Sequence, residues 1–412
     1  MNFGFIKQYF GLPGRIYVLF LARIIAAMGS FVYSFLTLFM SSKLGYSEIT
    51  ISGYLMLLAV IMLPATLLGG KLADLFSRKM TYVVLMTFGE ISFLITGFLI
   101  DKPYVLKFIF AGFFFVNAAA PAISAMMMDF TRPENRRESM SLVYLGFNLG
   151  YAFGPMIAGF LFVHYLRWIF WGNALINLIS VILILLMIRD EAPDAESLKS
   201  AESDVTDVLS DKALAPPKRN LLLQLLSDPI LVVVAALAMT SAFGYSQIGY
   251  MLPLDMEDYF GIEVGSRAYG VIWSLNGFTV FLLTPLFVYV LKKRNVIFNL
   301  AVGSVMFAAG FAGYAFTHNL PIMYMLVAVW TSGEVIGASN VGVFIASHAP
   351  VRYRARYQSI YDIIQGTGRA VGPMLMGYFL AGHTISQGWL LCGGLCAVSA
   401  IAYFVMSASG KR

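Results

Sequence analysis

The chain consists mainly of long apolar stretches that charged and turn residues interrupt at similar intervals. Each stretch is long enough for a helix that crosses the hydrocarbon core of a bilayer, which takes about 20 residues. Charged residues make up only 12% of the 412 residues, about half of the share in ordinary soluble domains. We therefore predict an all-α integral membrane protein with twelve transmembrane helices. They are expected near residues 14–40, 46–70, 80–100, 104–128, 138–163, 167–188, 229–252, 268–291, 296–317, 320–347, 356–382 and 386–407.

One long polar segment separates the twelve predicted helices into two sets of six. It runs from Arg189 to Asp228 and contains nine acidic residues and the Pro216-Pro217 pair. This composition is typical of a flexible linker. We expect an N-terminal six-helix bundle over residues 1–188, a linker over 189–228 and a C-terminal six-helix bundle over 229–412.

Lysine and arginine residues are concentrated in alternate loops. The side that holds both termini and the linker carries twenty-one of them, whereas the opposite side carries five. Because basic loops resist translocation, both termini and the linker are predicted to lie in the cytoplasm of a multi-pass plasma-membrane protein. The net charge of +6 therefore indicates topology, and we expect no nucleic-acid partner.

The two halves repeat one pattern at a spacing of 218 residues. The repeat pairs Gly150 with Gly368, Gly154-Pro155 with Gly372-Pro373, Gly159 with Gly377 and Trp171 with Trp389. Two six-helix units of the same orientation imply a pseudo-twofold axis along the membrane normal, with a central cavity that can open to either face. Such an architecture serves transport by alternating access.

The loop between the second and third predicted helices carries the most specific motif. Residues 69–79 read GGKLADLFSRK, which resembles the Gly-x-Leu-Ala-Asp-Arg-x-Gly-Arg-Lys signature of the major facilitator superfamily, with departures at Leu75 and Ser77. The resemblance implies the major facilitator fold. It also implies that Asp74 braces a cytoplasmic gate, with Arg78 as its pairing partner. The alternative is a basic loop that only sets topology.

Two further stretches resemble those of drug:proton antiporters in the same superfamily. In the fifth predicted helix, small residues at 150, 154 and 159 permit close helix approach, and Pro155 predicts a kink. We assign Gly154 and Pro155 to gating. The preceding loop runs from Asp129 to Arg136 and resembles an Asp-x-x-x-x-Glu-Asn-Arg stretch. Asp129 is either a surface acid at a helix end or part of a gate and proton-release network with Arg136.

Five charged residues lie at membrane depth. Facing lipid, each would cost roughly 2.5–3.5 kcal/mol, so we expect them to face the cavity or one another. Three acids and two bases leave one excess negative charge, which a single proton would neutralise. The five are Glu90, Glu334, Asp362, Arg23 and Arg369.

Glu334 is the leading candidate for proton coupling, because Gly333-Glu334 resembles a Gly-Glu pair that carries a functional acid in related multidrug transporters. The alternative is a static ion pair with an intramembrane arginine. Glu90, Asp362 and Asp129 are the further coupling candidates. Arg23 and Arg369 are assigned to the cavity, together with the polar residues Asn148, Tyr151, Gln247 and Asn276.

These observations predict a monomeric, proton-coupled secondary transporter that exports amphiphilic or lipophilic small molecules. The alternatives are a proton-coupled uptake symporter for a polar nutrient, or a lipid flippase. We expect contact with membrane lipid and no cofactor or metal, with protons as the coupling ion. An enzyme is disfavoured because the four histidines are scattered without ligand spacing and no nucleophile motif or ATP-binding P-loop occurs.

Overall fold

The computed structural model describes residues 9–132, 134–189, 228–349 and 354–409. Helices make up 87% of these residues, and none of them forms a strand. The first half contains α2 (Gly14–Met28), α3 (Phe31–Leu38), the π-helical turn η1 (Phe39–Lys43), α4 (Glu48–Leu75), α5 (Arg78–Phe98), α6 (Val105–Asp129), α7 (Arg136–Tyr151), α8 (Gly154–His164) and α9 (Leu166–Met187). The second half contains α12 (Pro229–Leu291), α13 (Val296–Tyr314), α14 (Leu320–His348), α15 (Arg354–Leu380) and α16 (Ile385–Ala408).

Ten helical segments in the described part of the chain are long and apolar enough to cross a membrane. One of them, α12, has 63 residues and is broken at Gly261, whose φ of 72° and ψ of 166° are not helical. An unbroken helix of that size would be about 95 Å long, roughly three times the hydrocarbon thickness, so α12 supplies two spans. The 27-residue α15 is long enough but too polar to be among the ten. Counting both gives the predicted twelve, and the all-α membrane fold is confirmed.

The predicted kink at Pro155 is present as a break between two helices. The helix α7 ends at Tyr151 and α8 begins at Gly154, with Pro155 in the first turn of α8. Proline has no N–H to donate to the carbonyl four residues earlier, which here belongs to Tyr151. Pro373 has the equivalent position in the second half, yet α15 continues through it.

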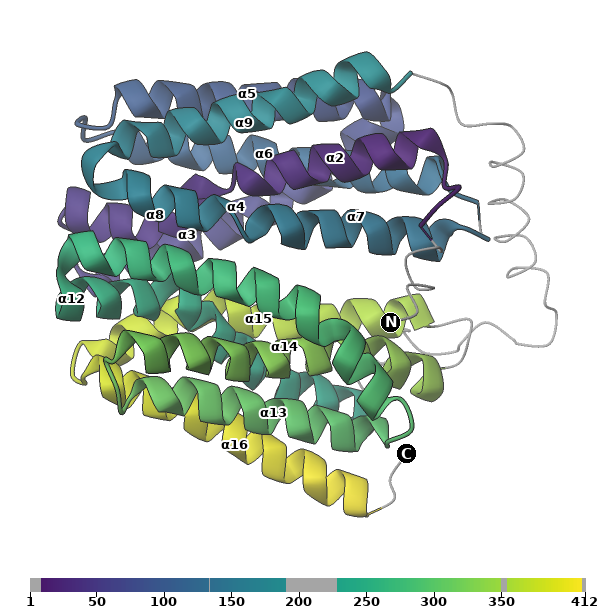
Figure 1. Cartoon of the computed structure of the whole chain (residues 1–412), viewed down its shortest axis with the longest axis vertical. Helices are drawn as coiled ribbons and strands as arrows, with labels where there is room; N and C mark the ends of the chain where they lie inside the picture. Colours follow the sequence, from purple (N-terminus) through teal and green to yellow (C-terminus); the bar gives the residue numbers. More distant parts are fainter. Residues whose placement is uncertain (1–8, 133, 190–227, 350–353, 410–412) are drawn as a thin grey trace. The chain divides into compact units, whose positions relative to one another are not determined.

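The chain divides into two compact units. Unit 1 consists of Met1–Leu36, Leu57–Ala201 and Ile262–Gly277. Within it, α5 packs on α6 and α9, and α2 packs on α7 and α9 (Figure 1). Its core contains buried apolar side chains from these helices, among them Leu19, Met86, Ala119 and Ile184.

Unit 2 consists of Thr37–Met56, Glu202–Gly261 and Phe278–Arg412. Here α13 packs against both α14 and α16, and α15 contacts the same two helices (Figure 1). A core of apolar side chains joins α12 to these four helices, and includes Leu231, Leu300, Phe344 and Tyr403.

The two units differ from the predicted halves in two short segments, because 262–277 groups with unit 1 and 37–56 groups with unit 2. Close backbone contact explains why residues 262–277 group with unit 1. A Cβ on Gly270 would lie only 2.5 Å from the Pro155 carbonyl oxygen, so the backbones at these two residues touch. Side-chain hydrogen bonds explain why residues 37–56 group with unit 2. Thr37 donates to the Gly249 carbonyl at 2.7 Å, and Tyr250 donates to the Glu48 carbonyl at 2.9 Å. Residues 190–227 of the predicted linker lie outside the described part of the chain.

Candidate functional site

A cavity of about 330 Å³ lies inside unit 2, among α12, α13, α14, α15 and α16. Three of the five charges predicted at membrane depth line it: Glu334, Asp362 and Arg369. The rest of the lining combines apolar and aromatic side chains with a few neutral polar ones. It includes Leu300, Phe307, Val341, Tyr361, Tyr403, Ser241, Ser304, Gln358 and Gln365.

Glu334 is half-buried on α14 beside a close contact with α13. A Cβ on Gly333 would lie 2.6 Å from the Gly303 carbonyl oxygen, so glycine at both positions brings the two helices together. The Glu334 carboxylate accepts a hydrogen bond from the Tyr245 hydroxyl on α12, with 3.3 Å between the oxygens. Packing of α13 and α14 therefore sets the position of Glu334, and a side chain from a third helix binds its carboxylate.

Tyr245 also contacts Arg369, the basic residue that lines the cavity. The guanidinium carbon of Arg369 lies 5.2 Å from the centre of the Tyr245 ring, within the range of a cation–π interaction. The Trp330 ring packs edgewise against the Tyr245 ring, with 5.8 Å between the ring centres. Tyr245 thus connects Glu334 on α14 to Arg369 on α15. The sequence does not indicate this role, since one tyrosine among 22 carries no distinguishing pattern.

Asp362 and Arg369 lie seven residues apart on α15 and do not bind each other in the described contacts. Arg369 reaches Tyr245 on another helix. Asp362 instead accepts a hydrogen bond from Gln358, one turn earlier on α15, at 2.9 Å. In the described contacts of this cavity, each of the two carboxylates accepts a hydrogen bond from a neutral donor, and the guanidinium lies against an aromatic ring.

The other two charges at membrane depth, Glu90 and Arg23, belong to unit 1. Glu90 is only 1% exposed, and Asn173 on α9 donates a hydrogen bond to its carboxylate at 3.0 Å. Arg23 has its guanidinium carbon 4.7 Å from the centre of the Phe147 ring. Tyr82 lies near enough to both charged groups for electrostatic interaction. Glu90 is thus a buried, amide-bound acid and does not line the cavity of unit 2.

The predicted gating pairs are corrected by the structure. Arg78 forms an ion pair with Asp129 rather than with Asp74, which is exposed at the end of α4. Arg78 is the first residue of α5 and Asp129 is the last residue of α6. A helix dipole disfavours a positive charge at its N-terminus and a negative charge at its C-terminus. Pairing of Arg78 with Asp129 therefore relieves an unfavourable interaction at each of these two helix ends. Arg136, which one of the two alternatives placed in a network with Asp129, donates to Thr131 at 3.4 and 3.5 Å.

The glycine pattern of the fifth predicted helix forms a packing surface. A Cβ on Gly150 would lie 2.2 Å from the Ile24 carbonyl oxygen, and one on Gly154 would lie 2.6 Å from that of Met28. The backbone of α2 therefore touches α7 and the start of α8. In unit 2, a Cβ on Gly368 would lie 2.3 Å from the Met239 carbonyl oxygen, so the equivalent helices make the same close approach.

Four predicted cavity residues, Asn148, Tyr151, Gln247 and Asn276, do not line the cavity of unit 2 in the described part of the chain. Asn148 donates to the Tyr144 carbonyl of its own helix at 2.9 Å. The Tyr151 hydroxyl lies 3.2 Å from the Ser34 hydroxyl. Gln247 is fully buried and donates to the Phe243 carbonyl at 3.0 Å, and Asn276 is 5% exposed.

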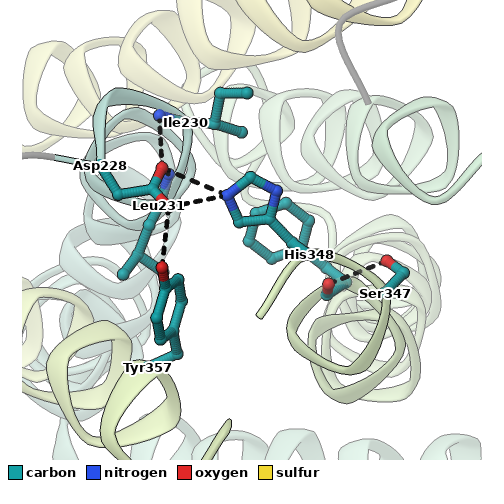
Figure 2. Close-up of polar contacts among 7 residues, drawn as sticks. Asp228, Ile230, Leu231, Ser347, His348 and Tyr357 are labelled. Carbon is teal, nitrogen blue, oxygen red and sulfur yellow. Dashed lines mark hydrogen bonds and ion pairs between the residues drawn. The ribbon is translucent and has the colours of Figure 1, made fainter. Parts of the chain in front are cut away.

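A polar cluster that no sequence pattern indicated surrounds Asp228 at the start of α12 (Figure 2). Asp228 caps α12 by accepting from the Ile230 and Leu231 N–H groups, each at 3.1 Å. It also contacts His348 Nε2 at 2.9 Å and accepts from the Tyr357 hydroxyl at 3.1 Å. Burial raises the pKa of the Asp228 carboxyl, but the hydrogen bonds from Leu231, His348 and Tyr357 outweigh it and lower the pKa below its usual 3.8. Asp228 thereby ties the beginnings of α12 and α15 to the end of α14.

Comparison with known proteins gives consistent matches over most of the chain. The sequence model described as Major Facilitator Superfamily matches residues 19–373. A Na(+), Li(+), K(+)/H(+) antiporter of Planococcus maritimus is 23% identical, over 91% of each chain. Multidrug resistance protein MdtH of Proteus mirabilis (strain HI4320) is 22% identical, over 86% of this chain and 84% of that protein. The crystal structure of a POT family transporter in complex with a thioalcohol conjugated peptide has a TM-score of 0.75 at 14% identity, over 98% of each chain.

Proposed function

The chain belongs to the major facilitator superfamily, and we propose that it couples protons to the export of amphiphilic or lipophilic small molecules by alternating access. That it is a multi-pass membrane transporter and not an enzyme follows from the family itself. The coupling ion, the direction and the substrate are the proposed parts. The observation that carries them is the group of Glu334, Tyr245, Asp362 and Arg369 around one cavity.

The charge of this group supports proton coupling. Two carboxylates and one guanidinium line the cavity, which leaves one excess negative charge. An unbalanced charge at membrane depth is costly, and one proton makes the set neutral. Protonated Glu334 no longer attracts the Tyr245 hydroxyl as a charged acceptor, so binding of a proton changes the contacts among α12, α14 and α15.

Apolar and aromatic lining residues support a lipophilic substrate. Leu300, Phe307, Val341 and Tyr403 offer apolar surface, whereas the polar groups are few and grouped around Glu334 and Asp362. A cavity of this chemistry binds compounds that combine an apolar body with a polar or charged end. The cation/proton antiporter name of one relative agrees with proton exchange, and the multidrug-resistance name of another agrees with drug-like substrates.

In the proposed cycle, substrate binding from the cytoplasm or inner leaflet favours release of the proton from Glu334, and protonation from the other side returns the empty carrier. Because the inward-open and outward-open states then bind the proton with different affinity, the proton gradient drives transport. We further propose that the protein functions as a monomer in the plasma membrane, in contact with membrane lipid, with both termini in the cytoplasm.

Glu334→Gln tests the proposal. In proteoliposomes with an imposed pH gradient, wild-type protein is expected to accumulate or expel a lipophilic dye in proportion to the gradient, whereas a polar peptide and a sugar are not moved. The Gln variant should retain dye exchange at equal pH and lose the dependence on the gradient, since it cannot bind a proton. Glu263→Gln is the matched control, because Glu263 is 55% exposed and pairs only with Arg267 four residues later in the described contacts. Unchanged gradient-driven flux in the Glu334 variant would refute proton coupling at this residue.

A further inference from the structure

A second cavity of about 490 Å³ lies in unit 2, at the end that contains the α13–α14 and α15–α16 connections. Its lining comes from η1, the start of α4 and the segment between them, from α12 near Gly261, from the connections α13–α14 and α15–α16, and from the start of α16. In the predicted topology this end faces outward. The described lining contains four carboxylates and two histidines but no lysine or arginine. These titratable residues are Glu48, Asp255, Glu257, Asp258, His318 and His383.

Asp255 and His318 form a fixed contact within this cavity. His318 Nε2 lies 3.1 Å from one Asp255 carboxylate oxygen, and the indole N–H of Trp389 donates to the other at 3.1 Å. The Asp255 side chain is 6% exposed, while that of His318 is 25% exposed. The pair therefore joins α12, α16 and the connection between α13 and α14. Its histidine can still exchange a proton with the cavity.

His318 also packs on the residues next to the break in α12. Its ring stacks on Tyr259 with 3.9 Å between centres and 9° between planes. Two residues later, Gly261 has a φ of 72°, a backbone conformation that residues with side chains rarely adopt. The stack thus holds the chain immediately before its non-helical residue.

Gly261 is also the place where the chain passes from one compact unit to the other. Unit 2 includes residues up to Gly261, and the next residue, Ile262, begins a segment of unit 1. The other crossings in the described residues follow Leu36, Met56 and Gly277, and each lies within helical backbone. Because Gly261 interrupts the helix, it absorbs backbone rotation more easily than those positions.

We propose that His318 and Asp255 form a proton-binding site on the outer side of the protein that controls the hinge at Gly261. Protonated His318 makes an ion pair with Asp255 and places a cation on the Tyr259 ring. It also offsets the negative charge of Glu48, Glu257 and Asp258. His383 and the Tyr46 and Tyr314 hydroxyls are the other titratable groups near the pair. With His318 neutral, the carboxylates repel one another and the stack on Tyr259 weakens, so the hinge becomes freer as the outer pH rises.

The first test measures protonation of His318 directly. Purified full-length protein with ¹³C-labelled histidine is titrated in lipid nanodiscs and followed by NMR, and His318→Gln identifies the His318 signal among the four histidines. We expect the His318 signal to change with pH, and Asp255→Asn to alter that pH dependence, because the Asp255 carboxylate lies 3.1 Å from His318 Nε2. A His318 signal that does not respond to pH, or an identical response in the folded Asn variant, would overturn the proposal.

The second test measures the hinge. Hydrogen exchange of the peptide covering residues 257–264, corrected for the chemical effect of pH, should show protection that falls as His318 loses its proton. His318→Gln should abolish this pH dependence, whereas His383→Gln should retain it, since His383 stacks on Phe379 and bonds to its carbonyl within one turn. Persistence of the pH dependence in His318→Gln would contradict the proposal. Neither test measures transport, so neither depends on the proposed role of Glu334.

Discussion

Neutral side chains position the charged residues of unit 2. Tyr245 binds Glu334 through its hydroxyl and Arg369 through its ring, and Trp389 binds Asp255. The sequence indicated Glu334, Asp362 and Arg369 as charged residues inside predicted spans, because each interrupts a long apolar stretch. The partner of Glu334 and Arg369 was not predictable, since Tyr245 is one of 22 tyrosines and lies far from both residues in the sequence.

At the same scale, Asp228 provides a prediction about pH. Because hydrogen bonds lower the pKa of its carboxyl below 3.8, the carboxylate stabilises the folded protein above that pH, and the stabilisation is lost as pH falls through the folded-state pKa. Asp228→Asn should therefore unfold at a lower temperature than wild type at pH 7, with a smaller difference near pH 3. Asp228→Ala also removes the helix cap, so it should lower the free energy of unfolding by about 1 kcal/mol more than Asp228→Asn does.

Thermal unfolding in detergent at several pH values measures this difference. Asp101→Asn is the control, because Asp101 and its partner Arg167 are both more than half exposed, at 56% and 53%. Exposed pairs contribute little, so that variant should unfold near the wild-type temperature throughout. An equal effect of Asp228→Asn at pH 3 and pH 7 would exclude its carboxylate as the cause.

At the scale of helices, packing depends on glycines spaced along one face. The carbonyl of Ile24 would lie 2.2 Å from a Cβ on Gly150, and backbone cannot move aside as a flexible side chain does. Gly150→Ala is therefore expected to destabilise unit 1 by about 1–3 kcal/mol through overpacking, seen as a lower unfolding temperature. Gly53→Ala is the matched control, since a Cβ on Gly53 in α4 meets nothing within 4 Å. Similar unfolding temperatures for the two variants would show that α2 and α7 are not in tight contact.

The sequence repeat predicted this helix packing in part. Spacing of Gly150 and Gly154 and its recurrence at Gly368 indicated close approach in both halves, and α2 and α12 supply the contacted backbones. The pattern did not indicate which helix would be contacted. Nor did it indicate that Pro155 begins a new helix, whereas α15 continues through Pro373.

For the whole molecule, the charge asymmetry predicts which loops face the cytoplasm. With Cys392 and Cys396 replaced, a cysteine at Lys293, after α12, should react with a membrane-impermeant maleimide only in broken cells. A cysteine at Lys102, between α5 and α6, should react in intact cells. Both positions are exposed, so lack of reaction would not reflect burial. Labelling with the opposite sidedness would reverse the predicted topology and with it the outer location of His318.

The sequence alone determined the number of spans, the family motif and the charged residues inside the predicted spans. Each of these follows from local composition, because lipid excludes charge over any stretch of about 20 residues. Only the tertiary structure decided that Arg78 pairs with Asp129, that Tyr245 joins Glu334 to Arg369, and that residues 262–277 group with unit 1. These outcomes depend on which helix ends and faces meet. That is settled by packing between segments distant in the chain, which local composition does not encode.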